Sequence, residues 1–141
     1  MLSANNYHSE IYIGLGELYL VSGQLKSAEV NFQSALTLNL SSVNALIGLA
    51  HTEEKRNNLE NADKYYQRAI QINPNYIGAH EEYASYLFNQ GIYAEAINEF
   101  KKIISLKPKY SNAYNSLGAA YFARGDIERG IKAFQKSLSI N

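Results

Sequence analysis

The sequence contains no cysteine, no tryptophan and only two prolines among its 141 residues. Without cysteine the chain can form no disulfide, thiolate zinc site or iron–sulfur cluster, and it has no cysteine nucleophile. Lysine and arginine together number 13, and so do aspartate and glutamate. The chain therefore lacks the basic surplus on which nucleic-acid binders depend, and we expect no nucleic acid among its partners.

Long apolar runs are also missing. No stretch approaches the ~18 consecutive apolar residues of a membrane-spanning helix. The first ten residues have neither the cationic region nor the apolar core of a signal peptide. We therefore expect no membrane span and a cytoplasmic location, or a periplasmic one if the chain is a fragment of a larger protein.

The sequence does contain a repeat with a period of 34 residues. When the chain is aligned with itself at this period, small residues share one column and aromatic residues share another. The small column is Gly16, Ala50, Ala84 and Gly118, and the aromatic column is Phe32, Tyr66, Phe100 and Phe134. A fixed period of this size indicates stacked supersecondary units, in which the small residues admit the aromatic ones.

Each repeat reads as two helices joined by a tight turn. In the first half of repeat one, Tyr12, Leu15, Gly16 and Tyr19 follow the i, i+3, i+4, i+7 spacing of a helix face. The break between the two halves is marked by a residue suited to the left-handed conformation that ends a helix: Gly23, Asn57, Gly91 and Gly125. We predict a lead of residues 1–8 and one domain over 9–141, with repeats 9–42, 43–76, 77–110 and 111–141.

These residues resemble the tetratricopeptide repeat, with its Trp-x2-Leu-Gly-x2-Tyr, Ala-x3-Phe and terminal Pro pattern. The resemblance implies an all-α fold, an α-solenoid of four helix-turn-helix repeats in a right-handed superhelical array with a concave groove. It also implies a non-catalytic scaffold for protein–protein interaction. The sequence departs from the pattern at five positions, where we expect weaker packing contacts: Glu53, His80, Ile103, Gly130 and Ser137.

Catalytic and metal-binding motifs are not found. There is no Gly-x-Ser-x-Gly elbow, no phosphate-binding glycine-rich loop and no His-Glu-x-x-His helix. The nearest metal-like group is His80, Glu81 and Glu82, but successive residues on a helix point about 100° apart and cannot share one ion. His80 shares a column with packing residues, so we predict a half-buried imidazole. We expect no enzyme activity, no cofactor and no metal.

A second stripe on the first helix of each repeat lies about 130° around the helix from the packing face. The resemblance implies that this stripe lines the groove and binds a partner protein or peptide. The predicted groove residues are Glu10, Ile13, Glu17, Asn44, Ile47, His51, Glu54, Glu81, Glu82, Ser85, Phe88, Asn112, Asn115 and Phe122. Apolar side chains on such a face indicate a binding site. The alternative for Phe88 and Phe122, near the helix ends, is packing against the next repeat.

The charge of this stripe indicates the kind of partner. Its carboxylates favour a basic or neutral segment and would repel a terminal carboxylate. The clamp of Lys, Asn and Arg that holds a peptide's C-terminus in similar chaperone-binding proteins is missing. Two alternatives stay open. The chain is a regulatory or adaptor fragment of a larger multidomain protein, or it self-associates through its final helix, which has no polar cap after it.

Overall fold

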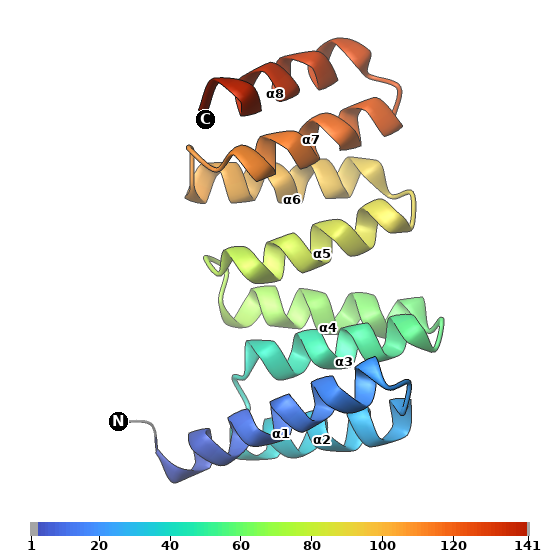
Figure 1. Cartoon of the computed structure of the whole chain (residues 1–141), viewed down its shortest axis with the longest axis vertical. Coiled ribbons are helices and arrows are strands. Elements are labelled where there is room, and N and C mark those ends of the chain that lie inside the picture. Colours follow the sequence, from blue (N-terminus) through green and yellow to red (C-terminus); the bar gives the residue numbers. More distant parts are fainter. Residues whose placement is uncertain (1–2, 141) are drawn as a thin grey trace. The chain divides into compact units, whose positions relative to one another are not determined.

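The structure, a computed structural model, describes residues 3–140, and in this range it contains eight α-helices and no strand. The helices are α1 (Ala4–Val21), α2 (Leu25–Leu38), α3 (Val43–Lys55), α4 (Leu59–Ile72), α5 (Ile77–Asn89), α6 (Tyr93–Leu106), α7 (Ser111–Ala123) and α8 (Ile127–Ile140) (Figure 1). The all-α helical repeat predicted from the sequence is confirmed. None of these described helices combines the length and the apolar character needed to cross a bilayer.

The helices recur with the predicted period. The second helix of each repeat begins 34 residues after the last, at Leu25, Leu59, Tyr93 and Ile127. The first helix of the chain departs from this rule, because α1 begins at Ala4 and Ser3 caps it by accepting a hydrogen bond from the backbone N–H of Asn6 at 3.3 Å. Most of the expected lead of residues 1–8 is therefore helical; residues 1 and 2 lie outside the described range.

The turns within the repeats have the predicted left-handed residue. The backbone angle φ is +77° at Gly23, +60° at Asn57, +76° at Gly91 and +90° at Gly125. Each turn is closed by the same backbone hydrogen bond, from the residue after the left-handed one to a carbonyl five residues back. These bonds are Gln24 to Tyr19 (2.8 Å), Asn58 to Glu53, Ile92 to Leu87 and Asp126 to Tyr121 (each 2.9 Å). This pattern satisfies the carbonyls at the helix end and reverses the chain.

The chain forms two compact units, Met1–Pro74 and Asn75–Asn141. In the first unit each helix packs against the next, and α1 also contacts α3. In the second unit α5 packs against α6, α6 against α7, and α7 against α8. Within each unit successive helices run in opposite directions (Figure 1). Each unit therefore has two helical hairpins and a core of its own.

Phe32 of α2 occupies the centre of the first unit. Its side chain is fully buried between Gly16 of α1 and Gly48 of α3. A Cβ atom at position 16 would lie 2.6 Å from Cε1 of the ring, and a Cβ at position 48 would lie closer still. The predicted pairing of the small column with the aromatic column is confirmed here, and a second glycine encloses the ring from the other side.

Four side chains in predicted packing columns are exposed instead. Tyr12 and Leu15 of α1 are 37% and 39% exposed, and Phe134 and Leu138 of α8 are 37% and 78% exposed. Their counterparts one repeat inward are covered by a neighbouring helix: Leu46 (0%), Leu49 (1%) and Phe100 (6%) are buried. The prediction that these columns are buried is wrong at α1 and α8 because the face concerned carries no covering helix.

Candidate functional site

Two adjoining hollows lie between α5 and α7 in the second unit. The larger has a volume of about 360 Å³ and the smaller about 150 Å³, and they share Ser85, Phe100 and Ser116. We call them together the α5–α7 groove. Its lining residues are Glu81, Ser85, Phe88, Asn89, Phe100, Ile103, Tyr110, Asn112, Ala113, Asn115, Ser116 and Ala119.

Helical spacing brings these side chains to one surface. On α5, Glu81, Ser85 and Phe88 follow at i, i+4 and i+7, so they share one face of the helix. On α7, Asn112 and Asn115 lie on the face that borders the same groove. Five residues of the predicted stripe therefore lie together, as the periodicity predicts. Their role in binding a partner stays a prediction.

The base of the groove is apolar and comes from α6. Phe100 is 6% exposed and Ile103 is fully buried. Ring stacking extends this base, because Phe88 packs edge-to-face on Tyr93 with the ring centres 5.3 Å apart. Phe88 is half-buried and borders the smaller hollow. The groove therefore has an apolar floor that a side chain of a ligand can contact.

The rim of the groove is polar and partly fixed by internal hydrogen bonds. The hydroxyl of Tyr110 donates to the Glu81 carboxylate, and this bond raises the pKa of Tyr110 above its ordinary value. Burial and the charge of Glu81 act in the same direction, and a hydrogen bond with Asn112 opposes them. The Nζ of Lys107 lies 4.4 Å from the centre of the Tyr110 ring. Glu81 is thus held in place by a neutral phenol.

In the first unit the corresponding positions do not all face a ligand. Ile13 is 4% exposed and lies on α1, which contacts α3 directly. The prediction that Ile13 lines an open groove is wrong, because isoleucine at this position is taken into the packing of the unit. The equivalent residue is Ile47 on α3, which is half-buried, but Glu81 on α5 and Asn115 on α7.

Two more predicted residues of the first unit make contacts within it. His51 is half-buried and packs edge-to-face on Tyr66, with ring centres 5.9 Å apart. Glu54 accepts a hydrogen bond from the Tyr66 hydroxyl. The remaining predicted residues do not border the α5–α7 groove: Glu10, Glu17, Asn44 and Phe122 are exposed, and Glu82 is half-buried.

His80 is buried more deeply than the sequence predicts. It is 3% exposed, and its Nδ1 lies 2.6 Å from Oε2 of Glu99, so the pair joins α5 to α6. Within residues 3–140 no three side chains of His, Asp or Glu lie together in a way that could hold a metal ion. His80 is therefore a packing residue with a polar partner on the neighbouring helix.

Sequence reasoning missed several groove residues. Tyr110 belongs to the turn before α7, and Phe100 and Ile103 belong to α6, whereas the prediction considered only the first helix of each repeat. A signal for Ser116 was present, since it lies four residues after Asn112 on the same helix face.

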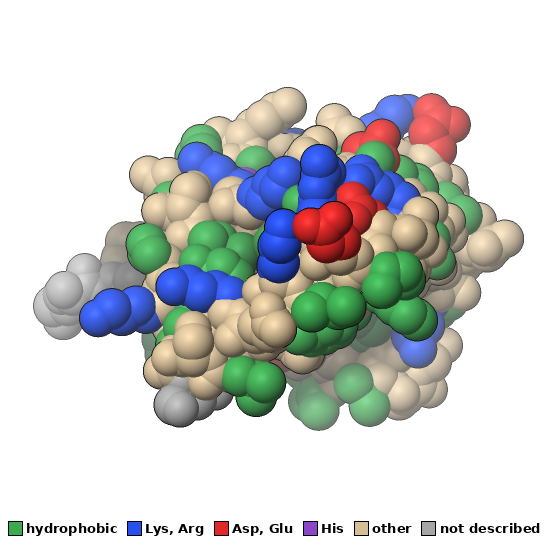
Figure 2. All heavy atoms as spheres, turned by 90° about the horizontal axis from the view of Figure 1, so that it is seen from above, with side chains coloured by type: hydrophobic (Ala, Val, Ile, Leu, Met, Phe, Trp, Pro, Cys, Tyr) green, Lys and Arg blue, Asp and Glu red, His purple; other side chains and the backbone are tan. Residues whose placement is uncertain are grey.

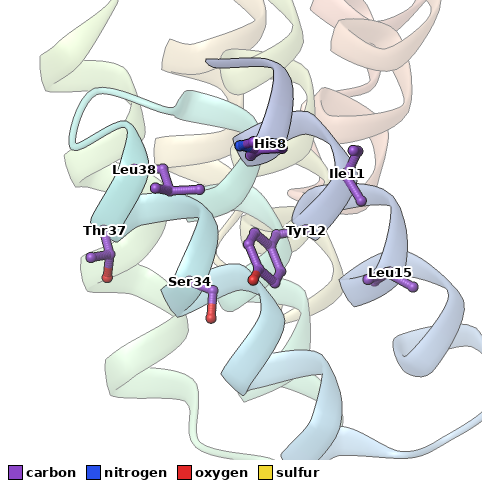
Figure 3. Close-up of a pocket in the computed structure, with 7 residues that line it drawn as sticks. All are labelled: His8, Ile11, Tyr12, Leu15, Ser34, Thr37 and Leu38. Atoms are coloured by element: carbon purple, nitrogen blue, oxygen red, sulfur yellow. The ribbon is translucent and has the colours of Figure 1, made fainter. Parts of the chain in front are cut away.

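A third hollow, also missed, lies on the outer face of the first unit between α1 and α2 and measures about 620 Å³. In Figure 3 the side chain of Tyr12 lies between the two helices, with Ile11 and Leu15 on α1. Ser34, Thr37 and Leu38 of α2 complete the lining together with His8. The residues that open it are those whose packing columns are uncovered at α1.

Comparison with known proteins places these features in a wider group. Family models described as "TPR repeat" and "Tetratricopeptide repeat" match residues 84–125, and residues 43–76 and 111–141, respectively. No curated protein matches the sequence.

Several solved structures are similar to the chain. The crystal structure of MamA is 28% identical, with a TM-score of 0.79 over 94% of this chain and 77% of that one. The pilF protein of Pseudomonas aeruginosa is 26% identical, with a TM-score of 0.86 over 99% of this chain and 64% of its own. YrrB, described as "a TPR protein with an unusual peptide-binding site", is 25% identical, with a TM-score of 0.75 over 94% of this chain and 69% of that one.

Proposed function

Because the chain belongs to the tetratricopeptide repeat family, whose fold serves as a scaffold for protein–protein interaction, we propose that it binds an extended peptide segment of a partner protein in the α5–α7 groove. The role is that of a non-catalytic adaptor. The observation that supports this proposal is the combination of a polar rim and an apolar floor in one hollow of the second unit. Its size lies in the range of pockets that take small ligands or a few side chains.

The side chains of the groove define the kind of segment that fits. The carboxylate of Glu81 suits a lysine or arginine side chain, since charge-assisted hydrogen bonds are stronger than neutral ones. The exposed amides of Asn112 and Asn115 can both donate to and accept from a peptide main chain. Phe88 and Phe100 suit an apolar side chain next to the basic one. A terminal carboxylate would be repelled by Glu81.

The comparison with YrrB adds support of a different kind. That protein is described as having a peptide-binding site, and it is similar to this chain over 94% of its length. The likeness supports a peptide as the ligand. The position of the site in this chain rests on the lining of the α5–α7 groove.

The proposal is tested by selecting binding peptides from a random displayed library and measuring their affinity by fluorescence anisotropy. We expect the selected peptides to carry lysine or arginine beside an apolar residue. Glu81→Lys should weaken the binding of such a peptide about tenfold or more, which corresponds to about 1.4 kcal/mol. A peptide in which the basic residue is replaced by glutamate should regain affinity for this variant, because the charge pair is restored with reversed sign.

A matched control is Glu95→Lys, which makes the same change of charge on α6 at an exposed position outside the groove. This variant should bind the selected peptide as tightly as the unchanged protein does. Equal loss of affinity in both variants would show that only overall charge matters. Unchanged binding by Glu81→Lys would contradict the proposed site.

A further inference from the structure

The outer face of α1 carries exposed apolar side chains that the proposed peptide site does not use. They recur along one side of the helix at spacings of four, four and three residues: Tyr7 (62% exposed), Ile11 (46%), Leu15 (39%) and Leu18 (70%). Ile11 and Leu15 also border the hollow of about 620 Å³ between α1 and α2. A contiguous apolar surface of this kind marks an interaction site.

A second apolar stripe lies on α8. Its side chains follow at spacings of four, three and four residues, which places them on one side of the helix: Ile127 (49% exposed), Ile131 (52%), Phe134 (37%) and Leu138 (78%). One repeat earlier, on α6, the equivalents Ile97 and Phe100 are 2% and 6% exposed, and α6 packs against α7. The stripe on α8 therefore corresponds to the side of α6 that includes its contact with the first helix of the next repeat.

The stripe on α1 is the other half of the same kind of junction. One repeat later, on α3, the equivalents of Ile11, Leu15 and Leu18 are Ala45, Leu49 and Thr52, which are exposed by 0%, 1% and 0%, and α3 packs against α2. A second helix of one repeat and a first helix of another thus each present an uncovered junction face. The two faces are complementary to each other, and neither is complementary to itself.

The charges of the two helices agree with this pairing. α1 carries two acidic residues, Glu10 and Glu17, and no lysine or arginine. α8 carries Arg129, Lys132 and Lys136 against a single Glu128. Figure 2, which looks onto the α8 side, shows Lys and Arg side chains gathered beside hydrophobic ones. Opposite charges favour contact between α1 and α8, whereas two α8 helices would bring like charges together.

We infer that α8 of one copy of the protein docks on the α1–α2 face of a second copy, head to tail. Ile11 and Leu18 are larger than Ala45 and Thr52, so α8 does not approach α1 as closely as α2 approaches α3. The hollow between α1 and α2 receives an apolar side chain of the α8 stripe instead. A contact of this type joins two different surfaces, so it builds rings or open chains rather than a closed pair related by a twofold axis.

Sedimentation velocity over a range of protein concentrations tests whether the copies associate. We expect the average mass to rise above the 15.8 kDa of one chain as concentration increases. Leu18→Glu and Ile131→Glu should each shift the association at least tenfold towards higher concentration, and their exposure means that neither change disturbs the fold. Ile92→Glu is the control, since it places the same charge on another exposed isoleucine, where repeat four has Asp126. A mass of 15.8 kDa at every concentration would overturn the inference.

Disulfide trapping tests the head-to-tail geometry and exploits the absence of native cysteine. Leu18→Cys and Ile131→Cys are prepared separately, one of them isotope-labelled, then mixed and oxidised. We expect the mixed dimer to form at least tenfold faster than either dimer of identical variants. Faster formation of the Ile131→Cys dimer would show an α8–α8 contact, and faster formation of the Leu18→Cys dimer an α1–α1 contact; either result overturns the head-to-tail arrangement.

Discussion

The enclosure of the Phe32 ring by two glycines is the tightest packing in the first unit. Gly16 and Gly48 approach the ring from α1 and α3, and the ring itself is fully buried. In the second unit Gly118 faces Phe134 in a similar way, with a distance of 3.0 Å from an added Cβ to the ring. The two sites differ in one respect, because Phe134 is 37% exposed and can move outward.

Gly48→Ala should lower the free energy of unfolding by about 1–3 kcal/mol, because the added methyl group overpacks a site with no free space. This loss exceeds the ~0.5–1 kcal/mol that alanine contributes as the better helix former. Gly118→Ala is the matched comparison and should change stability by less than about 0.5 kcal/mol, since Phe134 can yield and the helix gain offsets the contact. Urea denaturation measures both, and equal effects would contradict the argument.

The hydrogen bond from Tyr110 to Glu81 makes a prediction about pH. Below about pH 10, the ordinary pKa of tyrosine, the phenol is protonated in the folded and unfolded chain and its stabilisation is fully present. Because the pKa of Tyr110 is raised in the folded chain, this stabilisation is lost as the pH rises through that higher value. Glu81→Gln should bring the pKa back towards 10.

Carbon-13 NMR of labelled tyrosine follows this titration directly, with Tyr110→Phe to assign the signal. Glu95→Gln, which removes a carboxylate from an exposed position outside the groove, serves as the control and should leave the pKa of Tyr110 unchanged. If Glu81→Gln also left it unchanged, the hydrogen bond would not be the cause of the raised pKa.

At the scale of helices, a charged network ties the end of α3 to α2. Glu53 is 6% exposed, and its two carboxylate oxygens accept hydrogen bonds from Arg56 and from the side-chain amide of Asn58, each at 2.7 Å. Arg56 also bonds the carboxylate of Glu29 on α2 at 2.7 Å. These contacts raise the pKa of Arg56, the bond with Glu29 being the largest cause. The buried carboxylate is thus fully paired.

Removing the cation should matter more than removing its exposed partner. We expect Arg56→Ala to destabilise the protein by about 1–3 kcal/mol, because it leaves the buried Glu53 with one partner fewer. Glu29→Ala should cost no more than about 1 kcal/mol, because its side chain is 38% exposed and the pair is screened by water. Thermal or urea unfolding measures both, with Arg68→Ala as an exposed arginine control on α4. The reverse order of effects would contradict this interpretation.

Helix pairs also explain which part of the site could be predicted. The 100° periodicity correctly places Glu81, Ser85 and Asn115 on a shared surface, because the direction of a side chain from its own helix is a local property. It fails for Ile13, since burial depends on α1 contacting α3, which is a property of the pair. It also misses Tyr110, which reaches the groove from a turn.

For the molecule as a whole, the period determines most of the fold. Helix starts, left-handed turns and the pairing of small with aromatic columns all follow from a 34-residue repeat read in one sequence. The sequence prediction treats every repeat alike, so it expects Leu138 to be buried and Glu53 to weaken its contacts. In the structure Leu138 is 78% exposed and Glu53 is paired. Both differences arise from neighbours, which a repeat pattern does not record.

The packed isoleucines of the first unit and the open groove of the second give the chain two tolerances to sequence drift. Replacing Ile13 or Ile47 by a polar residue would disturb folding, so selection for stability restricts these positions. Asn115, at the equivalent position in the second unit, is exposed, and a substitution there changes what the groove recognises while the core stays intact. A lineage can therefore acquire a new partner by changing the second unit alone.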